Sequence, residues 1–145
     1  MTSFKVGTSF RVGDVMTRQV VYLPAGTTLE EAARAMRDAD IGDVVVTDGA
    51  DLYGLVTDRD IVVRAVAEGK NAARTTIGSV ANREIVMIEQ GSTAAEAAAL
   101  MRERSVRRIL VCDANRRLVG IVSRGDLAMR SDSSSALSDA PASRR

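Results

Sequence analysis

Two short stretches of this chain carry a hydroxyl and a carboxylate group at the same spacing. In Gly54–Ile61 and again in Gly120–Leu127, a glycine and two aliphatic residues lead into a hydroxyl residue, and an aspartate follows three positions later. A hydroxyl group donates and accepts hydrogen bonds, whereas an ionised carboxylate only accepts them. The duplicated pair therefore predicts two related sites.

The same period runs through the rest of the chain. Thr28 returns as Thr93, 65 positions on, and one extra residue within 113–117 moves the offset to 66, so that Gly54 returns as Gly120. A fixed internal period indicates supersecondary units that bury their apolar faces against each other. Each unit of about 60 residues would be marginally stable alone, so the 145 residues predict one pseudo-symmetric domain.

Composition restricts the chemistry further. The chain has no histidine and a single cysteine, Cys112, which removes the commonest general base, ordinary structural zinc and the Cys/His nucleophile. Phosphate-binding glycine loops are missing, and no repeated Asp/Glu cluster suggests carboxylate-only Mg²⁺ or acid/base chemistry. We therefore expect neither an enzyme nor a required cofactor.

Charge and hydropathy restrict partners and location. The net charge of +1 gives no reason to expect nucleic acid or an anionic membrane surface as a partner. An apolar run near 18 residues is missing, and residues 1–11 lack the apolar core of a secretory signal. One cysteine permits no intrachain disulfide and favours a reducing cytoplasm, with Cys112 an inert thiol in an apolar strand.

The predicted order of elements is strand–helix–strand–strand–helix, twice. Both Thr27/Glu30 and Thr28/Glu31 fit a capping box at the first helix, but the second repeat keeps only the equivalent of the latter. The predicted elements of the first repeat are a strand at 19–23, a helix with its apolar stripe at 29, 32, 33 and 36, strands at 44–46 and 52–56, and a helix over 58–69. Those of the second repeat are a strand at 85–88, a helix over 93–104, strands at 109–112 and 118–122, and a helix over 124–129.

These elements divide the chain into five parts. We expect a mobile N-terminal arm (1–11), the first repeat (12–69), a linker (70–76), the second repeat (77–130) and a disordered tail (131–145) that lacks periodicity and is rich in Ser, Asp and Ala.

This pattern resembles a tandem cystathionine β-synthase (CBS) domain pair, the Bateman module. The resemblance rests on the duplicated Gly-apolar-apolar-[Ser/Thr]-x-x-Asp motif and on the two entry segments, Val12–Thr17 and Ile77–Val80. It covers about residues 12–130 and is greatest to small stand-alone bacterial proteins. It implies an α/β fold of the α+β type, in which two βαββα CBS repeats pack pseudo-symmetrically through their sheets.

The resemblance also implies a regulatory module that binds an adenosine-containing ligand (AMP, ADP, ATP or a relative) in two clefts between the repeats. It places the ribose on the hydroxyl and the aspartate, the adenine beside strand residues two positions earlier, and the entry segment of the opposite repeat against the ligand. The residues implied are Ser123, Asp126, Ile121, Asp14 and Gln19 for one cleft, and Thr57, Asp60, Leu55, Ser79 and Glu84 for the other.

The two copies differ where a phosphate would lie. The second repeat has Arg108 before its buried strand and Arg124 beside the hydroxyl, whereas the first repeat has Asp43 at the position of Arg108. Members of the family often carry phosphate-binding basic residues there. We therefore expect the Ser123/Asp126 cleft to bind a nucleotide more strongly.

Two alternatives stay open. Each hydroxyl–aspartate pair also reads as a helix N-cap, which needs no ligand, and the strand residues could be plain core. The protein could instead be a ligand-free scaffold that dimerises and binds another, unidentified protein. In either case we expect a homodimer that meets through helical faces, with Ile61, Val62, Ala65 and Val66 in one unit and Ala97, Leu100 and Met101 in the other.

Overall fold

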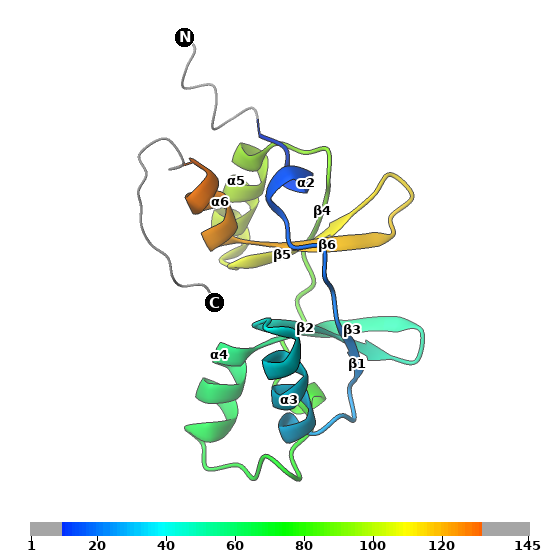
Figure 1. Cartoon of the computed structure of the whole chain (residues 1–145), viewed down its shortest axis with the longest axis vertical. Helices are drawn as coiled ribbons and strands as arrows, with labels where there is room; N and C mark the ends of the chain where they lie inside the picture. Colours follow the sequence, from blue (N-terminus) through cyan, green and yellow to red (C-terminus); the bar gives the residue numbers. More distant parts are fainter. Residues whose placement is uncertain (1–9, 132–145) are drawn as a thin grey trace. The chain divides into compact units, whose positions relative to one another are not determined.

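The computed structural model describes residues 10–131, which fold into two compact units that exchange a segment (Figure 1). Unit 1 combines residues 10–20 with residues 86–131, and unit 2 consists of residues 21–85. Each unit therefore contains most of one repeat together with the entry segment of the other.

Unit 2 is a three-stranded sheet with its helices on one face (Figure 1). The first strand pairs parallel with the second, and the second pairs antiparallel with the third. Its elements are β1 (Tyr22–Pro24), α3 (Leu29–Ala39), β2 (Asp43–Asp48), β3 (Asp51–Thr57), α4 (Asp58–Ile61), the π-helix η1 (Val62–Val66) and the 3₁₀-helix η2 (Ile77–Ser79).

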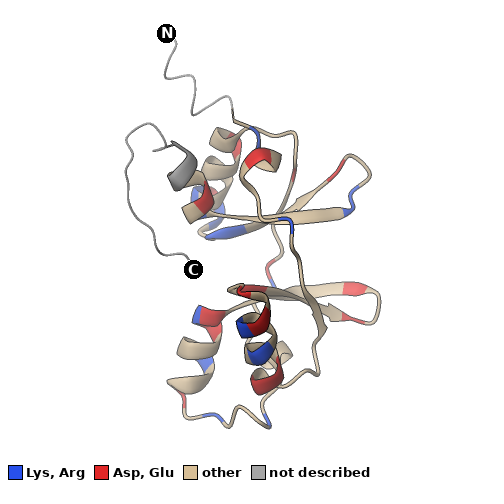
Figure 2. Cartoon of the chain, in the orientation of Figure 1, with Lys and Arg blue, Asp and Glu red and all other residues tan. Residues whose placement is uncertain are grey.

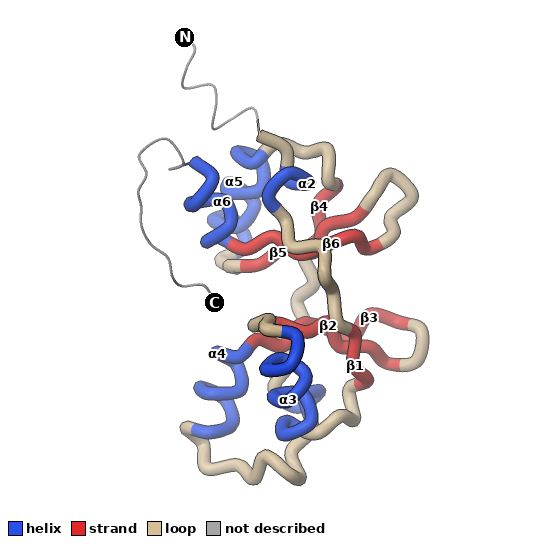
Figure 3. The backbone as a smooth tube through the Cα atoms, in the orientation of Figure 1, coloured by secondary structure: helices blue, strands red, loops and turns tan. Residues whose placement is uncertain are grey.

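Unit 1 repeats this arrangement, and Figure 3 shows the same alternation of strands and helices. Its elements are α2 (Val12–Val15), β4 (Met87–Glu89), α5 (Ala94–Arg104), β5 (Arg108–Cys112), β6 (Leu118–Ser123) and α6 (Arg124–Ser131). The predicted mixed α/β fold with two strand–helix–strand–strand–helix units is confirmed.

The long helices begin where the sequence predicted. Thr28 and Glu31 form a capping box at α3, since the Glu31 N–H donates to Thr28 Oγ1 (3.1 Å) and the Thr28 N–H donates to Glu31 Oε1 (3.0 Å). Thr93 and Glu96 do the same at α5. Both helices end at a residue in the left-handed backbone conformation, which is Asp40 for α3 and Ser105 for α5. The two repeats therefore begin and end this helix in the same way.

Each helix pair covers an apolar core built from its own sheet. Val44, Val45 and Val46 are fully buried, as the continuous apolar run predicted, and the Cys112 thiol is buried at the equivalent strand. Within the predicted helical stripe, Leu29, Ala32 and Met36 are buried but Ala33 is exposed. The stripe is narrower than predicted because a single helix face meets the sheet.

The strands that follow the entry segments begin later than predicted. β1 starts at Tyr22 rather than at residue 19, because the preceding residues belong to unit 1, where Thr17 exchanges hydrogen bonds with Ile121. β4 likewise starts at Met87 rather than at 85, after Asn82 has exchanged hydrogen bonds with Leu55 in unit 2. The chain crosses between the units at these two points.

The predicted helix over 58–69 is interrupted. One α-helical turn passes into η1, and the chain then turns at Gly69, whose φ of +73° makes it the left-handed stop that was expected. The predicted mobile arm is wrong for its last residues, since the Ala94 N–H donates to the Phe10 carbonyl and Arg11 pairs with Thr93.

At the other end, α6 runs to Ser131, one residue into the predicted tail. The rest of the predicted arm and tail lies outside the described residues.

Candidate functional site

The two hydroxyl–aspartate pairs form capping boxes of the same geometry. The Asp60 N–H donates to Thr57 Oγ1 (3.1 Å) and the Thr57 N–H donates to Asp60 Oδ2 (2.9 Å). In unit 1 the Asp126 N–H donates to Ser123 Oγ (3.0 Å) and the Ser123 N–H donates to Asp126 Oδ2 (2.9 Å). The capping interpretation is therefore confirmed at both positions. Each carboxylate still has a second oxygen that can accept hydrogen bonds from another molecule.

In each unit, the strand that pairs with the motif strand places an equivalent residue opposite the hydroxyl residue. Thr57 lies opposite Asp43 in the β2–β3 register, and Ser123 lies opposite Arg108 in the β5–β6 register. The Arg124 N–H donates to the Arg107 carbonyl at 2.8 Å, and an equivalent bond of 2.9 Å fixes the start of α4 on Gly42. The correspondence between Asp43 and Arg108 that the sequence offset gave is thus also a correspondence in space.

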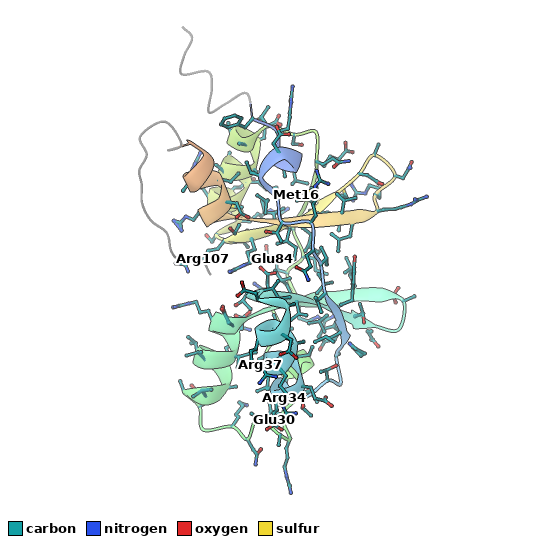
Figure 4. The ribbon with its side chains drawn as sticks, in the orientation of Figure 1. Met16, Glu30, Arg34, Arg37, Glu84 and Arg107 are labelled. Atoms are coloured by element: carbon teal, nitrogen blue, oxygen red, sulfur yellow. The ribbon has the colours of Figure 1, made fainter. Side chains whose placement is uncertain are left out.

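The glycine of each motif makes room for an entry segment. A Cβ atom at Gly54 would lie 2.5 Å from the Asn82 carbonyl oxygen, and one at Gly120 would lie 2.6 Å from Met16 Sδ and 2.8 Å from the Thr17 carbonyl oxygen. Figure 4 marks Met16 where the entry segment crosses the sheet of unit 1. Glycine is required here because two backbones approach closely.

The entry segments reach the hydroxyl–aspartate pairs with residues other than those predicted. Both run antiparallel to the strand that they meet, at Thr17↔Ile121 and Leu55↔Asn82. Gln19 and Glu84 follow these contacts, so the chain carries them along the strand away from Ser123 and Thr57. The residue before Glu84 is Arg83, and it fixes this part of the entry segment on β3. The Arg83 guanidinium lies 3.6 Å from the Tyr53 ring centre and donates to the Tyr53 carbonyl.

The residues that precede these contacts lie closer to the pairs. In unit 2 the Val80 carbonyl accepts a bond of 3.1 Å from Arg64, whose guanidinium lies 3.9 Å from Asp60. Val80 corresponds to Val15 in unit 1 by the 65-residue offset. Val80 was not among the predicted site residues, because its position follows from the antiparallel direction of the entry segment.

The other two predicted entry residues have local partners. Asp14 Oδ2 accepts from the Arg11 N–H (3.1 Å) and completes the cap of α2, a helix that contacts both β6 and α6. The Ser79 hydroxyl donates to the Thr76 carbonyl (2.7 Å) within η2, which contacts β3. Both side chains are exposed, on elements that lie against the strands carrying the motif.

The strand residues predicted to flank adenine lie on the sheet face that points away from the helices. Leu55 pairs with Val45 and Ile121 pairs with Leu110. Side chains alternate between the faces of a strand, and the core clusters contain the neighbours of these four residues but none of the four. Ile121 is nonetheless 3% exposed and Leu55 is half-buried, so a core role and a ligand role both stay open for them.

The charges around the two pairs are opposite in sign. Next to Thr57 and Asp60 are the carboxylates of Asp43 and Asp58 and the guanidiniums of Arg59 and Arg64; next to Ser123 and Asp126 in the chain or the strand register are three arginines, Arg107, Arg108 and Arg124. Figure 2 shows the basic residues at the start of β5. The residues beside Ser123 are thus mainly basic, whereas those beside Thr57 include two further carboxylates.

Comparison with known proteins identifies the family. The CBS domain profile matches the chain twice, over residues 12–66 and 77–132. The protein therefore belongs to the CBS-domain family, with two copies of the domain. The chain is 36% identical over 118 residues to the CBS domain-containing protein YhcV of Bacillus subtilis, covering 81% of this chain and 83% of the relative. It is also 36% identical over 116 residues to hypoxic response protein 1 of Mycobacterium tuberculosis, covering 79% of this chain and 80% of the relative.

Solved structures show the same fold. A putative signal-transduction protein with CBS domains from Burkholderia ambifaria superposes with a TM-score of 0.77 at 24% identity, covering 92% of this chain and 99% of the other. The structure of Hypoxic Response Protein I with two coordinated zinc ions has a TM-score of 0.64 at 35% identity, covering 81% and 96%.

The present chain offers few ligands for such an ion. It has no histidine, and among residues 10–131 no group of three Cys, Asp or Glu side chains could hold a metal. Over the same part of the chain no helix is long and apolar enough to cross a membrane.

Proposed function

We propose that this protein is a cytoplasmic regulatory module that senses an adenosine-containing ligand such as AMP, ADP or ATP. CBS-domain pairs are typically regulatory modules, and the chain belongs to that class. The ribose would lie on the hydroxyl–aspartate pair of each unit, with the Ser123/Asp126 site the stronger. Ligand binding would alter the affinity of the module for a regulated partner protein.

The observation that carries this proposal is the convergence at Ser123. The Ser123 hydroxyl and the Asp126 carboxylate cap α6, and three arginines, Arg107, Arg108 and Arg124, neighbour them in the chain or the strand register, next to an entry segment that belongs to the other repeat. A carboxylate can accept from the two vicinal hydroxyls of a ribose, and guanidinium groups bind phosphate with charge-assisted bonds. Thr57 and Asp60 repeat the hydroxyl and the carboxylate, but Asp43 stands where unit 1 has Arg108, and Arg64 is the basic residue near Asp60.

The same residues provide no means of turnover. The described site contains hydroxyl, carboxylate and guanidinium groups, and the chain has no histidine to act as a general base. We therefore expect bound nucleotide to be recovered unchanged. Sustained hydrolysis that the Asp126→Ala or Asp60→Ala exchange abolishes would overturn the assignment as a non-catalytic module.

A thermal-shift screen with AMP, ADP, ATP, NAD and S-adenosylmethionine tests the proposal. A ligand that binds only the folded protein stabilises it, by about 2.7 kcal/mol at a hundredfold excess over Kd. We expect at least one of the five to raise the melting temperature, and adenine-free ribose 5-phosphate to serve as the control. A protein that none of the five stabilises at millimolar concentration would contradict the proposal.

A second function, self-association as an interaction module, is favoured by exposed valines. Val62, Val63 and Val66 are 56%, 45% and 63% exposed. Some solved relatives assemble, as the hexameric CBS-CP12 protein from bloom-forming cyanobacteria does. We propose a homodimer, and light scattering at micromolar concentration should give twice the chain mass.

Of the residues predicted for the dimer contact, Val62 and Val66 are exposed, whereas the others are buried or partly buried. Ala65, Ala97 and Met101 are only 1%, 0% and 4% exposed and belong to the two cores, so the predicted contact is wrong at these positions. Ile61 and Leu100 also pack partly against the cores. Val63, which the sequence analysis did not name, is exposed beside the two predicted valines.

A further inference from the structure

Arg64 connects the hydroxyl–aspartate pair of unit 2 with the entry segment that lies against it. The Arg64 Nη1 group donates to the Val80 carbonyl at 3.1 Å, and Arg64 Nε lies 3.9 Å from Asp60 Oδ1. The second of these distances permits electrostatic attraction but is too long for a hydrogen bond. Arg64 is therefore held in place by the entry segment rather than by Asp60.

The two carboxylate oxygens of Asp60 have different surroundings. Oδ2 accepts from the Thr57 N–H at 2.9 Å as part of the capping box, whereas Oδ1 faces Arg64. The Asp60 side chain is 20% exposed and the Arg64 side chain is 50% exposed, so a molecule from solvent can contact both. A hydrogen-bond acceptor and a donor thus lie next to each other at the oxygen that the cap does not use.

An ordinary helical ion pair does not account for this arrangement. Asp60 and Arg64 are four positions apart in the chain, a spacing that pairs opposite charges on an α-helix. Here, however, α4 ends at Ile61, and Arg64 is the middle residue of the π-helix η1. Turns of this kind occur frequently at functional sites. The two side chains come from helical turns of different type, and the direct hydrogen bond between them is not made.

A carboxylate beside a guanidinium has the chemistry to bind a vicinal diol. Each ribose hydroxyl donates one hydrogen bond and also accepts. A hydroxyl that donates to Asp60 Oδ1 keeps its lone pairs for a donor on its other side. The Arg64 guanidinium has several N–H donors, of which the Val80 carbonyl takes one. A sugar without these hydroxyls would satisfy neither group.

We propose that Arg64 is a ribose-binding residue of unit 2, and that together with Asp60 it selects ribonucleosides over deoxynucleosides. Its guanidinium donates to the hydroxyl oxygens whose protons Asp60 Oδ1 accepts. This inference rests on the proposed function and adds to that site a residue outside the hydroxyl–aspartate motif. The sequence repeats the residue, since Arg130 follows Asp126 by the same four positions in the second repeat.

Adenosine and 2′,3′-dideoxyadenosine test this role in the full-length protein, because neither has a phosphate and they differ only in the two hydroxyls. Asp126→Ala serves as the background, so that binding reports on unit 2. Arg64→Met removes the donor and keeps an unbranched side chain. Arg59→Met is the matched control, because Arg59 is an exposed arginine next to Asp60 in the chain. Calorimetry gives the Kd of adenosine directly and that of dideoxyadenosine by competition.

We expect Arg64→Met to reduce the preference for adenosine over dideoxyadenosine by about tenfold, the usual effect of losing one hydrogen bond to a charged group. Arg59→Met should leave the preference unchanged. An unchanged preference in Arg64→Met, with both nucleosides weakened equally, would overturn the inference, because Arg64 would then only hold the entry segment at Val80. The same loss of preference in both arginine variants would also overturn it, since charge alone would then explain the effect.

A background protein that binds no adenosine would overturn the inference as well. Nucleotide binding by the parent protein would in that case leave the proposed function standing. A parent protein that none of the five ligands of the thermal-shift screen stabilises would overturn both.

Discussion

The two units of this molecule share the backbone arrangement around the hydroxyl–aspartate motif and differ in the charges beside it. Both hydroxyl–aspartate pairs cap a helix, both motif glycines admit an entry segment from the other repeat, and both strand registers place one residue opposite the hydroxyl. That residue is Asp43 in unit 2 and Arg108 in unit 1. The shared features stabilise the fold, whereas the residues that differ are those that we propose to make unit 1 the stronger site for an anionic ligand.

This comparison separates two roles within one motif. The glycine, hydroxyl and aspartate have structural reasons that apply with or without a ligand, so their duplication alone would not show binding. The residues whose charge differs between the two repeats lie beside the motif, at Asp43 and Arg108. Variants at these positions therefore test the proposed nucleotide preference more directly than variants of the shared motif.

The largest loss of stability is expected when a side chain at the motif glycine blocks the close approach of the entry segment. Gly54→Ala places a methyl group 2.5 Å from a backbone oxygen that cannot rotate away, whereas the nearest atom at Gly120→Ala is the sulfur of a flexible methionine. Overpacking costs about 1–3 kcal/mol. We expect Gly54→Ala at the upper end of this range and Gly120→Ala below it, as measured by denaturant unfolding.

Matched glycines provide the control for that experiment. A Cβ atom at Gly26 in unit 2 or at Gly91 in unit 1 would meet nothing within 4 Å. Their alanine variants should unfold within about 0.5 kcal/mol of the parent, as surface substitutions commonly do. Equal losses at Gly26 and Gly54 would refute the close approach of the entry segment.

A smaller change in free energy, measured as nucleotide affinity, should follow from giving unit 2 the charge that unit 1 has opposite the hydroxyl residue. With the unit 1 site disabled by Asp126→Ala, Asp43→Arg should strengthen ATP binding to unit 2 by about tenfold, which corresponds to about 1.4 kcal/mol. A new guanidinium replaces a repelling carboxylate there. Calorimetric titration measures the gain.

The control variant makes the same change of charge farther from the hydroxyl residue. Asp48→Arg lies at the other end of β2 and is exposed, so long-range attraction acts on it while direct contact does not. Equal gains from Asp43→Arg and Asp48→Arg would show that net charge, and not the position opposite the hydroxyl, governs binding.

The smallest expected change is the loss of stability when the capping boxes of α3 and α5, which have no proposed ligand, are weakened. Glu31→Ala and Glu96→Ala each remove one half of an equivalent box, at α3 and α5. Loss of a helix cap costs about 1 kcal/mol, and the two variants should lose similar amounts in thermal unfolding. Nucleotide affinity should not change in either; a tenfold loss would mean that any weakened cap disturbs the site.

The sequence could predict most of what local chemistry determines. The caps at Thr28 and Thr93, the buried run Val44–Val46 and the stop at Gly69 all follow from residues that lie close together in the chain. The equivalence of Asp43 and Arg108 followed from the repeat offset and is confirmed by the strand registers.

What the sequence could not predict depends on contacts between distant segments. The late starts of β1 and β4 and the displacement of Gln19 and Glu84 from the hydroxyl–aspartate pairs arise because each entry segment crosses to the opposite unit in an antiparallel direction. The local pattern of the entry segments is the same whether they run towards or away from the pair. The change from α4 to η1 within the predicted helix over 58–69 is likewise not encoded in the side-chain periodicity.

The most direct test of the account is a calorimetric titration of AMP and ATP into the parent protein, Asp126→Ala and Asp60→Ala, with Glu96→Ala and Glu31→Ala as cap controls. A charge-assisted contact contributes about 1.5–3 kcal/mol, so the unit with the three arginines should dominate binding. We expect Asp126→Ala to weaken binding at least tenfold, and Asp60→Ala to have a much smaller effect. A larger loss from Asp60→Ala, or equal losses from both, would contradict the claim that the charges beside the motif make unit 1 the nucleotide site.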